Sequence, residues 1–356
     1  MNTILERLEK NQYTLIAEVG VNYYDIAREM QISNMDAAKL MVKKAKEAGI
    51  HAVKFQTYKA ETLAAKESPY YWDITEEPTR SQYELFKKFD AFGEAEYREL
   101  YEYCEEIGIE FLSTPFDVAS ADYLCDMMNV YKISSSDLSN LPFIAYMAKK
   151  NKPIMLSIGA SELEEIEAAV ATIRKYNDKK LILMHCVLEY PTPLEHTNLN
   201  KIVSLKEHFP DAYIGYSDHT KPTPEFEVAQ TAYNLGATVL EKHYTLDKTL
   251  KGNDHYHAMD PDDAREILRR IDHINMLRGT YALSCLESEQ KARKNARRSL
   301  VADTDIPAGT VITEEMLTFK RPNSGISPAD IGTVIGKKAA NDIAADTVLQ
   351  WDMLTD

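Results

Sequence analysis

The stretch TLIAE, residues 14–18, is apolar between a threonine and a glutamate, and seven similar runs follow it along the first three quarters of the chain. Runs that are almost wholly apolar are typical of parallel strands buried on both faces of a sheet. Each run also stops at a polar or ionisable residue. The eight runs are residues 14–18, 52–56, 110–114, 130–134, 153–157, 181–186, 213–218 and 238–243.

Segments with helical periodicity separate these runs, at residues 35–48, 94–106, 161–176, 224–235 and 262–276. Alternating strands and helices predict an α/β fold, and eight such units predict a closed (β/α)8 (TIM) barrel. The chemistry of such barrels lies at the carboxyl ends of the strands. The residues that end the runs are therefore the first candidates for an active site: Glu18, Lys54, Gln56, Ser113, Thr114, Lys132, Ser134, Ser135, Ser157, His185, Ser217, Asp218, His219, Glu241 and His243.

A second domain is expected, because 356 residues exceed the roughly 250 of a typical barrel. After the polar run at 287–298 the chain becomes β-rich, with proline and glycine as punctuation. DIPAGTVITEEMLT at 305–318 aligns with DIAADTVLQWDMLT at 342–355. This repeat predicts a duplicated strand–turn–helix unit and approximate internal symmetry. The expected boundaries are a barrel at 1–280, a linker at 281–298 and a small domain at 299–356.

Bulk composition excludes several classes of partner. A net charge of −15 argues against nucleic acid and anionic membranes. No apolar stretch approaches the roughly 20 residues that span a bilayer, and the first residues lack the apolar core of a signal peptide, so we expect a cytoplasmic protein. The four cysteines, Cys104, Cys125, Cys186 and Cys285, are scattered as unpaired thiols in a reducing compartment would be.

Two histidines, His219 and His243, end the seventh and eighth runs. Because adjacent strands lie about 4.8 Å apart, the two imidazoles can meet on one ion, and two ligands leave positions open for water and substrate. Mn²⁺, Zn²⁺ or Fe²⁺ would suit them. The alternative is two hydrogen-bonded barrel histidines. His255 and His257, two residues apart on a loop, are more typical of polar lid residues than of a second metal site.

Two lysines, Lys54 and Lys132, stand inside otherwise apolar runs, where a charge is costly unless it is paired or solvated. Together with the hydroxyls of Thr114, Ser134, Ser135 and Ser157 they predict a cationic cup for phosphate or carboxylate. One alternative is a structural pair with Glu18 or Glu241, and another is Schiff-base chemistry on Lys132. Because the positive charges of nearby lysines favour an ionised carboxylate, Glu18 should ionise easily. We therefore expect it to orient water or hydroxyls rather than to donate a proton.

The motifs AEVGVN, VKFQT, FLSTPFD, YKISSSD, LSIGAS, HCVLEYPTP, YSDHT and EKHYTLDK, in that order, resemble the sialic acid synthase family, N-acetylneuraminate synthase and its relatives. The tail from about Ser299, with FKRP, is similar to the antifreeze-like (β-clip) domain that ends those enzymes. The resemblance implies condensation of phosphoenolpyruvate with an N-acylated aldose. The expected products are a nine-carbon 3-deoxy-ulosonic acid and phosphate.

The resemblance also implies roles for particular residues. His219 and His243 would hold a divalent metal, usually Mn²⁺, that polarises the aldehyde, and Glu18 would handle the water or the charge at C2. Phosphoenolpyruvate would be held by Lys54, Thr114, Lys132, Ser135, Ser157 and Ser217. Gln56, Tyr190 and Asp254 would meet the sugar. Arg321, in FKRP, would reach the N-acyl group from a partner subunit, which implies a domain-swapped homodimer.

One segment departs from the family pattern. Cys-Thr-Asn or Cys-Thr-Ser usually precedes Tyr-Pro-Thr-Pro, whereas here Cys186, Val187 and Leu188 precede Glu189. Loss of a polar group changes which sugar substituent can be satisfied. N-acetylmannosamine, a diacetamido-trideoxyhexose of legionaminic or pseudaminic type, and a spore-coat relative all remain open as acceptors. A lysine Schiff-base pyruvate aldolase and a non-catalytic carbohydrate-binding protein are the competing functions.

Overall fold

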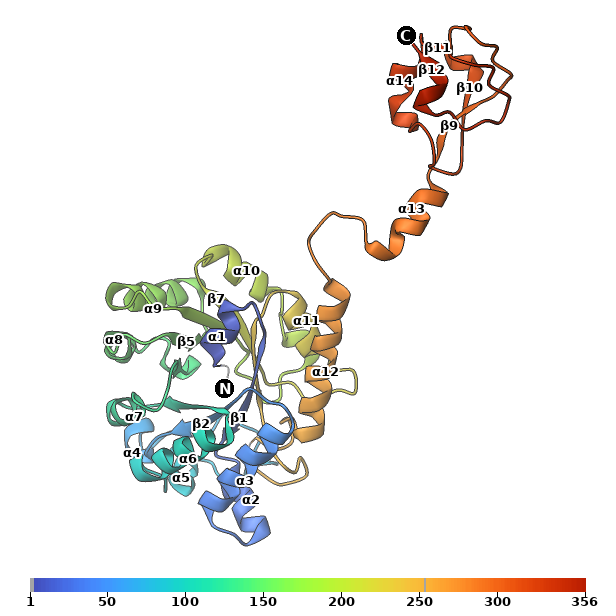
Figure 1. Ribbon diagram of the computed structural model, residues 1–356. Coiled ribbons are helices and arrows are strands. Elements are labelled where there is room, and N and C mark those ends of the chain that lie inside the picture. Colours follow the sequence, from blue (N-terminus) through green and yellow to red (C-terminus); the bar gives the residue numbers. More distant parts are fainter. Residues whose placement is uncertain (1–2, 253) are drawn as a thin grey trace. The chain divides into compact units, whose positions relative to one another are not determined.

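The chain folds into two compact units, Met1–Arg278 and Gly279–Asp356 (Figure 1). The computed structural model describes residues 3–252 and 254–356. Within those ranges no helix combines the length and the apolar character needed to cross a membrane. All four cysteines are free thiols, as predicted, with Cys104 and Cys186 buried.

Eight parallel strands form the first unit, in the order β3-β2-β1-β8-β7-β6-β5-β4, and β3 also lies against β4, so the sheet nearly closes into a barrel. Every predicted run coincides with one strand, and the predicted barrel is confirmed. Most ends differ by one or two residues. The strands are β1 (Thr14–Gly20), β2 (Ala52–Thr57), β3 (Glu110–Pro115), β4 (Tyr131–Ile133), β5 (Ile154–Ser157), β6 (Leu181–His185), β7 (Tyr213–Asp218) and β8 (Val239–His243).

Helices surround the strands (Figure 1). The longer ones bury one face, as α3 does with Ala37, Met41 and Ala45, which lie four residues apart. Ser33 caps α3 by accepting a hydrogen bond from the Asp36 amide at 3.0 Å. The helices of this unit after α1 are α2 (Tyr23–Met30), α3 (Asn34–Glu47), α4 (Ala60–Leu63), α5 (Gln82–Lys88), α6 (Glu94–Ile107), α7 (Val118–Leu124), α8 (Leu141–Lys149), α9 (Leu163–Tyr176), α10 (Lys201–His208), α11 (Glu227–Asn234) and α12 (Pro261–Arg278).

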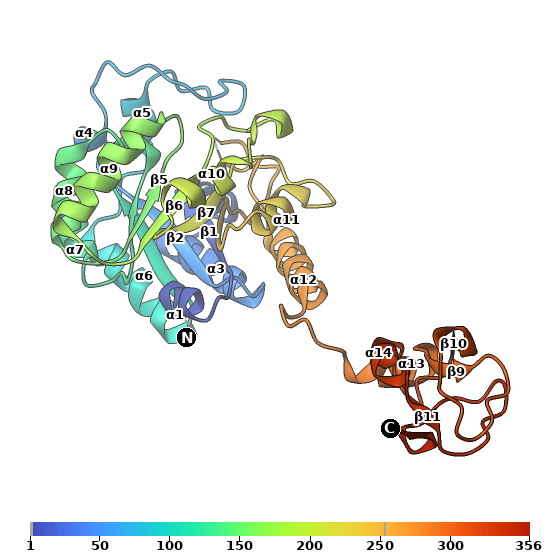
Figure 2. The same cartoon turned by 90° about the horizontal axis from the view of Figure 1, so that it is seen from above.

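A short first helix, α1 (Ile4–Glu9), lies at the amino-terminal end of the strands. Its buried Ile4 and Leu8 join the apolar side chains that fill the barrel interior, among them Ile16 and Leu112. The Ile4 amide donates a hydrogen bond to Glu110 Oε2 at 2.6 Å. In Figure 2, α1 lies at one end of the barrel and the loop between α4 and α5 at the other. The amino-terminal end is thus filled, and the opposite end remains for a site.

Glu110 makes the stability of this end depend on pH. Burial raises its pKa from 4.5 to about 7, although Ile4 and Asn129 donate hydrogen bonds to it. Between these values the folded state keeps a proton that the unfolded chain releases. The stabilisation is therefore full below pH 4.5 and is lost as the pH rises through 7.

We expect Glu110→Gln to remove this dependence and to raise the free energy of unfolding above pH 7 by up to about 3 kcal/mol. Chemical denaturation at about pH 5 and about pH 8 measures the difference. Glu167→Gln, on the exposed side of α9, is the matched control. If Glu110→Gln kept the pH dependence of the unaltered protein, the assignment to Glu110 would be wrong.

The second unit contains two small antiparallel sheets. β9 (Ser299–Ala302) pairs with β10 (Leu317–Lys320), and β11 (Lys338–Ala339) pairs with β12 (Leu354–Thr355). Its own core includes Leu300, Ile312 and Leu349. Two short helices, α13 (Gln290–Ala296) and α14 (Ile331–Val334), complete the unit.

The two copies of the internal repeat make equivalent hydrogen bonds to each other. Asp342 accepts a hydrogen bond from the Ala308 amide at 2.7 Å, and Asp305 accepts one from the Ala345 amide at 2.8 Å. Ile306 and Ile343 pair across the centre. The predicted symmetry is therefore present, but the predicted strand–turn–helix order is wrong. Each copy ends in a 3-10 turn of three residues, at 314–316 and at 351–353, and a short strand follows each turn.

Candidate active site

A pocket of about 420 Å³, including its open mouth, lies at the carboxyl ends of the strands. Polar side chains supply most of its wall. Phe116, Ser134, Cys186, Leu188 and Glu241 are lining residues that the resemblance did not assign. The eleven lining residues that it did assign are Glu18, Lys54, Gln56, Thr114, Lys132, Ser135, Ser157, Tyr190, Ser217, His219 and His243.

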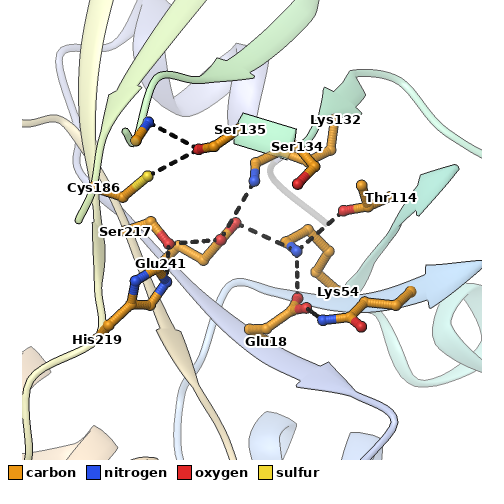
Figure 3. Close-up of polar contacts among 12 residues, drawn as sticks. Glu18, Lys54, Thr114, Lys132, Ser134, Ser135, Cys186, Ser217, His219 and Glu241 are labelled. Atoms are coloured by element: carbon orange, nitrogen blue, oxygen red, sulfur yellow. Dashed lines mark hydrogen bonds and ion pairs between the residues drawn. The ribbon is translucent and has the colours of Figure 1, made fainter. Parts of the chain in front are cut away.

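Two buried lysines share two buried carboxylates at the floor of this pocket (Figure 3). Lys54 forms an ion pair with Glu18, donates to Thr114 Oγ1 at 3.2 Å and lies 3.7 Å from Glu241 Oε2. Lys132 Nζ lies 3.5 Å from Glu241 Oε1. The lysines thus make the Lys–Glu pairs that the sequence offered as an alternative, and they do so within the pocket wall.

The two carboxylates differ in acidity. Burial raises the pKa of Glu18, and the attraction of Lys54 reduces this rise without reversing it. Burial acts in the same direction on Glu241, but Lys132 and Lys54 outweigh it and lower the pKa of Glu241 to about 2. The expectation that Glu18 ionises easily did not account for desolvation, which makes Glu18 harder to ionise than a carboxylate in water.

Glu241 is the functional residue that sequence reasoning underrated. The sequence indicated Glu241 only as a strand-end residue and as a possible ion-pair partner of a lysine. In the structure it also accepts a hydrogen bond from Ser217 Oγ at 2.9 Å. It therefore contacts both lysines and a hydroxyl (Figure 3). The available signal was strand alternation, because Glu241 and His243 are two residues apart and face the same side of β8.

Hydroxyls and a thiol form another side of the pocket. Ser135 Oγ accepts a hydrogen bond from the Gly159 amide at 2.9 Å and lies 3.1 Å from Cys186 Sγ. A Cβ on Gly159 would lie 2.8 Å from that sulfur. Gln56 donates from Nε2 to Glu18 Oε1 at 2.9 Å, so its amide joins the carboxylate end of the pocket.

The predicted metal pair, His219 and His243, lies with ring centroids 5.5 Å apart. His219 Nδ1 lies 2.6 Å from the Val187 carbonyl oxygen and donates to it, which leaves Nε2 as the acceptor, as in many metal-bound histidines. Tyr190 covers His219, with ring centroids 4.2 Å apart. The ring geometry fits a divalent transition metal, and Nε2, which lies 3.4 Å from Ser217 Oγ, is the nitrogen that would bind it.

The lid interpretation of His255 and His257 is wrong, because both side chains are fully buried. His243, Asp254 and His257 bring potential ligand atoms within 4.8 Å of one another. His243 Nδ1 lies 3.4 Å from Asp254 Oδ2. Burial opposes protonation of His243, but Asp254 outweighs it and raises the pKa of this histidine.

Lys242 and Asp218 hold the strand end that carries His219. They are neighbours in register on β8 and β7, and Lys242 Nζ donates to Asp218 Oδ2 at 2.8 Å and to the Thr220 carbonyl at 2.6 Å. Asp218 Oδ1 accepts a hydrogen bond from the Thr220 amide at 2.9 Å. Asp218, a strand-end candidate, is therefore a support of the site rather than a part of its wall.

The remaining candidates lie elsewhere. Ser113 pairs with Thr57, and His185 lies 2.8 Å from the Thr197 carbonyl, outside the pocket. Asp254 contacts His243 from the loop after β8. Arg321 belongs to the second unit, where it is exposed and lies beside Lys291 and Asn295 of α13.

Comparison with known proteins identifies the barrel. The model of the NeuB family matches residues 41–282, which is more than half of the chain. The chain belongs to the NeuB family. In addition, the SAF domain matches residues 297–355, the part that the resemblance described as antifreeze-like.

Three NeuB relatives illustrate the match. The N,N'-diacetyllegionaminic acid synthase of Campylobacter jejuni is 36% identical over 94% of this chain and 98% of its own. The enzyme of that name from Legionella pneumophila is 34% identical over 95% and 93%. The crystal structure of the N-acetylneuraminic acid synthetase of Leptospira borgpetersenii superposes with a TM-score of 0.68 and 31% identity, over 79% of this chain and 90% of its own.

Proposed function

We propose that this NeuB protein condenses phosphoenolpyruvate with an N-acylated aldose to a nine-carbon 3-deoxy-ulosonic acid and phosphate. The observation that supports it most is one pocket that joins two buried lysines and several hydroxyls to the histidine pair His219 and His243. The names of the relatives, which are legionaminic and sialic acid synthases, agree with this reaction class.

Phosphoenolpyruvate would occupy the floor of the pocket. Lys54 and Lys132 would hold its phosphate and carboxylate by charge-assisted hydrogen bonds. The hydroxyls that would share this role are those of Thr114, Ser135, Ser157 and Ser217. In the free protein Glu18 and Glu241 act as counterions, so an anionic substrate would have to replace them as partners of the lysines.

His219 and His243 would hold the divalent metal, for which Mn²⁺ is one suitable ion. When bound, such an ion acts as a Lewis acid toward a carbonyl oxygen. The chain itself supplies orientation. Val187 fixes the tautomer of His219, and Tyr190 lies against its ring.

Glu18 would act near C2 of phosphoenolpyruvate. Positive charge develops at C2 when C3 attacks the aldehyde, and a nearby carboxylate stabilises it. Because burial raises the pKa of Glu18, this side chain can also accept a proton from the water that adds at C2. Gln56 orients it through the 2.9 Å hydrogen bond.

The acceptor sugar would meet Gln56, Tyr190 and Asp254 at the mouth of the pocket. Leu188 and Phe116 add apolar surface to the same wall. Apolar groups suit a methyl or an acyl substituent better than a hydroxyl, whose lost hydrogen bonds would be uncompensated. We therefore place a diacetamido-trideoxyhexose of legionaminic type first among the acceptors.

The test is release of phosphate from phosphoenolpyruvate with a panel of N-acyl aldoses, and identification of the ulosonic acid by mass spectrometry. The expected result is release that requires both substrates. Sodium borohydride provides the discriminating control, because a Schiff-base aldolase would be trapped on Lys132 when pyruvate is present. Trapping, or no release with any acceptor, would overturn the proposal.

A domain-swapped homodimer, in which Arg321 completes the partner's site, is part of the proposal. Large exposed apolar patches commonly mark protein interfaces. Five large, exposed apolar side chains follow one another closely in the sequence, from the end of α12 into the segment after it: Met276, Leu277, Tyr281, Leu283 and Leu286.

Mixing Arg321→Ala with Lys132→Ala subunits should restore activity that neither variant has alone. The mixed dimer would contain one site with both residues intact, so about a quarter of the activity of the unaltered protein is the statistical ceiling after full exchange. Phosphate release before and after subunit exchange measures it. If exchanged dimers showed no recovery, Arg321 would not act in trans.

A further inference from the structure

His257 is a buried histidine that makes no hydrogen bond through its side chain to any of the described residues. Its side chain is fully buried, and neither Nδ1 nor Nε2 has a hydrogen-bond partner among the described residues. Buried polar atoms are nearly always paired, so an exception calls for an explanation such as a bound ion.

His255 shows that burial in this loop does not by itself leave an imidazole unpaired. It is equally buried, but its Nδ1 lies 2.8 Å from Thr245 Oγ1 and its Nε2 lies 3.2 Å from Asp25 Oδ2. Both ring nitrogens of His255 therefore have hydrogen-bond partners. Among the described residues, neither ring nitrogen of His257 has one.

The surroundings of His257 have the composition of a metal site. Its ring is 4.9 Å from that of His243, and the ligand atoms of His243, Asp254 and His257 lie within 4.8 Å of one another. His243 Nδ1 has no hydrogen bond, yet it lies 3.4 Å from Asp254 Oδ2. Two atoms that bind one ion at about 2.1 Å with a tetrahedral angle are about 3.4 Å apart.

We infer that His257 binds the divalent metal together with His243 and Asp254. His219 is not among these close ligand atoms and would join the centre through the proposed pair with His243. The centre would then have three imidazoles, those of His219, His243 and His257. Asp254 would supply a carboxylate oxygen to the ion. A ligand set this rich in nitrogen favours Zn²⁺, Co²⁺ or Fe²⁺ over Mg²⁺. The inference rests on the proposed metal dependence.

X-ray absorption spectroscopy of the full-length protein loaded with Zn²⁺ counts the imidazoles, and a Co²⁺ titration measures affinity. We expect three imidazoles in the unaltered protein and one fewer in His257→Ala. The affinity of His257→Ala should fall at least about 100-fold, because even the loss of an outer-shell partner costs about 10–100-fold. His273→Ala, which removes an exposed histidine of α12, should change neither value.

The outcomes separate the inference from the proposed function. An unaltered protein with two imidazoles, and a His257→Ala variant with unchanged affinity, would overturn the inference and leave metal dependence standing. An unaltered protein that binds no ion would overturn both. Because the imidazole count is made on the unaltered protein, a misfolded His257→Ala variant does not prevent a decision.

Discussion

Removal of divalent metal should abolish phosphate release, and Mn²⁺ or a similar ion should restore it. His219→Ala and His243→Ala should each lower kcat by at least about 1,000-fold, because a Lewis acid supplies several kcal/mol of transition-state stabilisation. Turnover after chelation and after addition of each ion measures the effect. His273→Ala is the control, since His273 is exposed and lies on α12.

Full activity of a metal-stripped His219→Ala protein would contradict this prediction. The Val187 carbonyl also loses its hydrogen bond in that variant, so structural damage must be distinguished from loss of a ligand. His219→Asn, which keeps a side-chain donor, separates the two. If His219→Asn were as active as the unaltered protein, the orientation of the loop rather than a metal would explain the loss.

Glu241→Gln should have opposite effects on binding and turnover. Without this carboxylate Lys54 and Lys132 lose a shared counterion, and an unpaired buried charge costs about 3–5 kcal/mol. An anion in the pocket would replace the missing charge. We therefore expect inorganic phosphate to bind about tenfold more tightly to the variant, while kcat falls about tenfold as phosphate leaves more slowly.

Thermal unfolding with and without phosphate checks this prediction. The variant should unfold at a lower temperature than the unaltered protein in a phosphate-free buffer, and saturating phosphate should recover most of the loss. Glu241→Asp, which keeps the charge, is the matched control. If phosphate stabilised both variants equally, Glu241 would not be the counterion of an anion site.

The fold was predictable because each strand carries its own signal. The run 52–56 is apolar apart from Lys54 until it stops at Gln56, and strand β2 (Ala52–Thr57) matches it within one residue. The repeated segments at 305–318 and 342–355 predicted symmetry correctly. Their 3-10 turns were not predicted, since turns of three residues leave no helical period in the sequence.

The site was predictable where side chains belong to strand ends and unpredictable where contacts decide their role. Lys54 and Lys132 stand out as charges within apolar runs. The raised pKa of Glu18 depends on burial, which no local pattern records. His257 lies in a loop, where spacing does not reveal that the chain folds it against His243.

Filling of the barrel by α1 has a consequence for the sequence of events during turnover. Since Ile4 and Leu8 fill the amino-terminal end of the barrel, the two substrates of the proposed reaction would enter, and its two products would leave, through the opposite end. Both lysines are buried within the pocket wall, and in the proposal the phosphoenolpyruvate site lies beneath the sugar site. A sugar that bound first would block access to the phosphoenolpyruvate site beneath it. Phosphoenolpyruvate should therefore arrive first, and phosphate should wait until the ulosonic acid has gone.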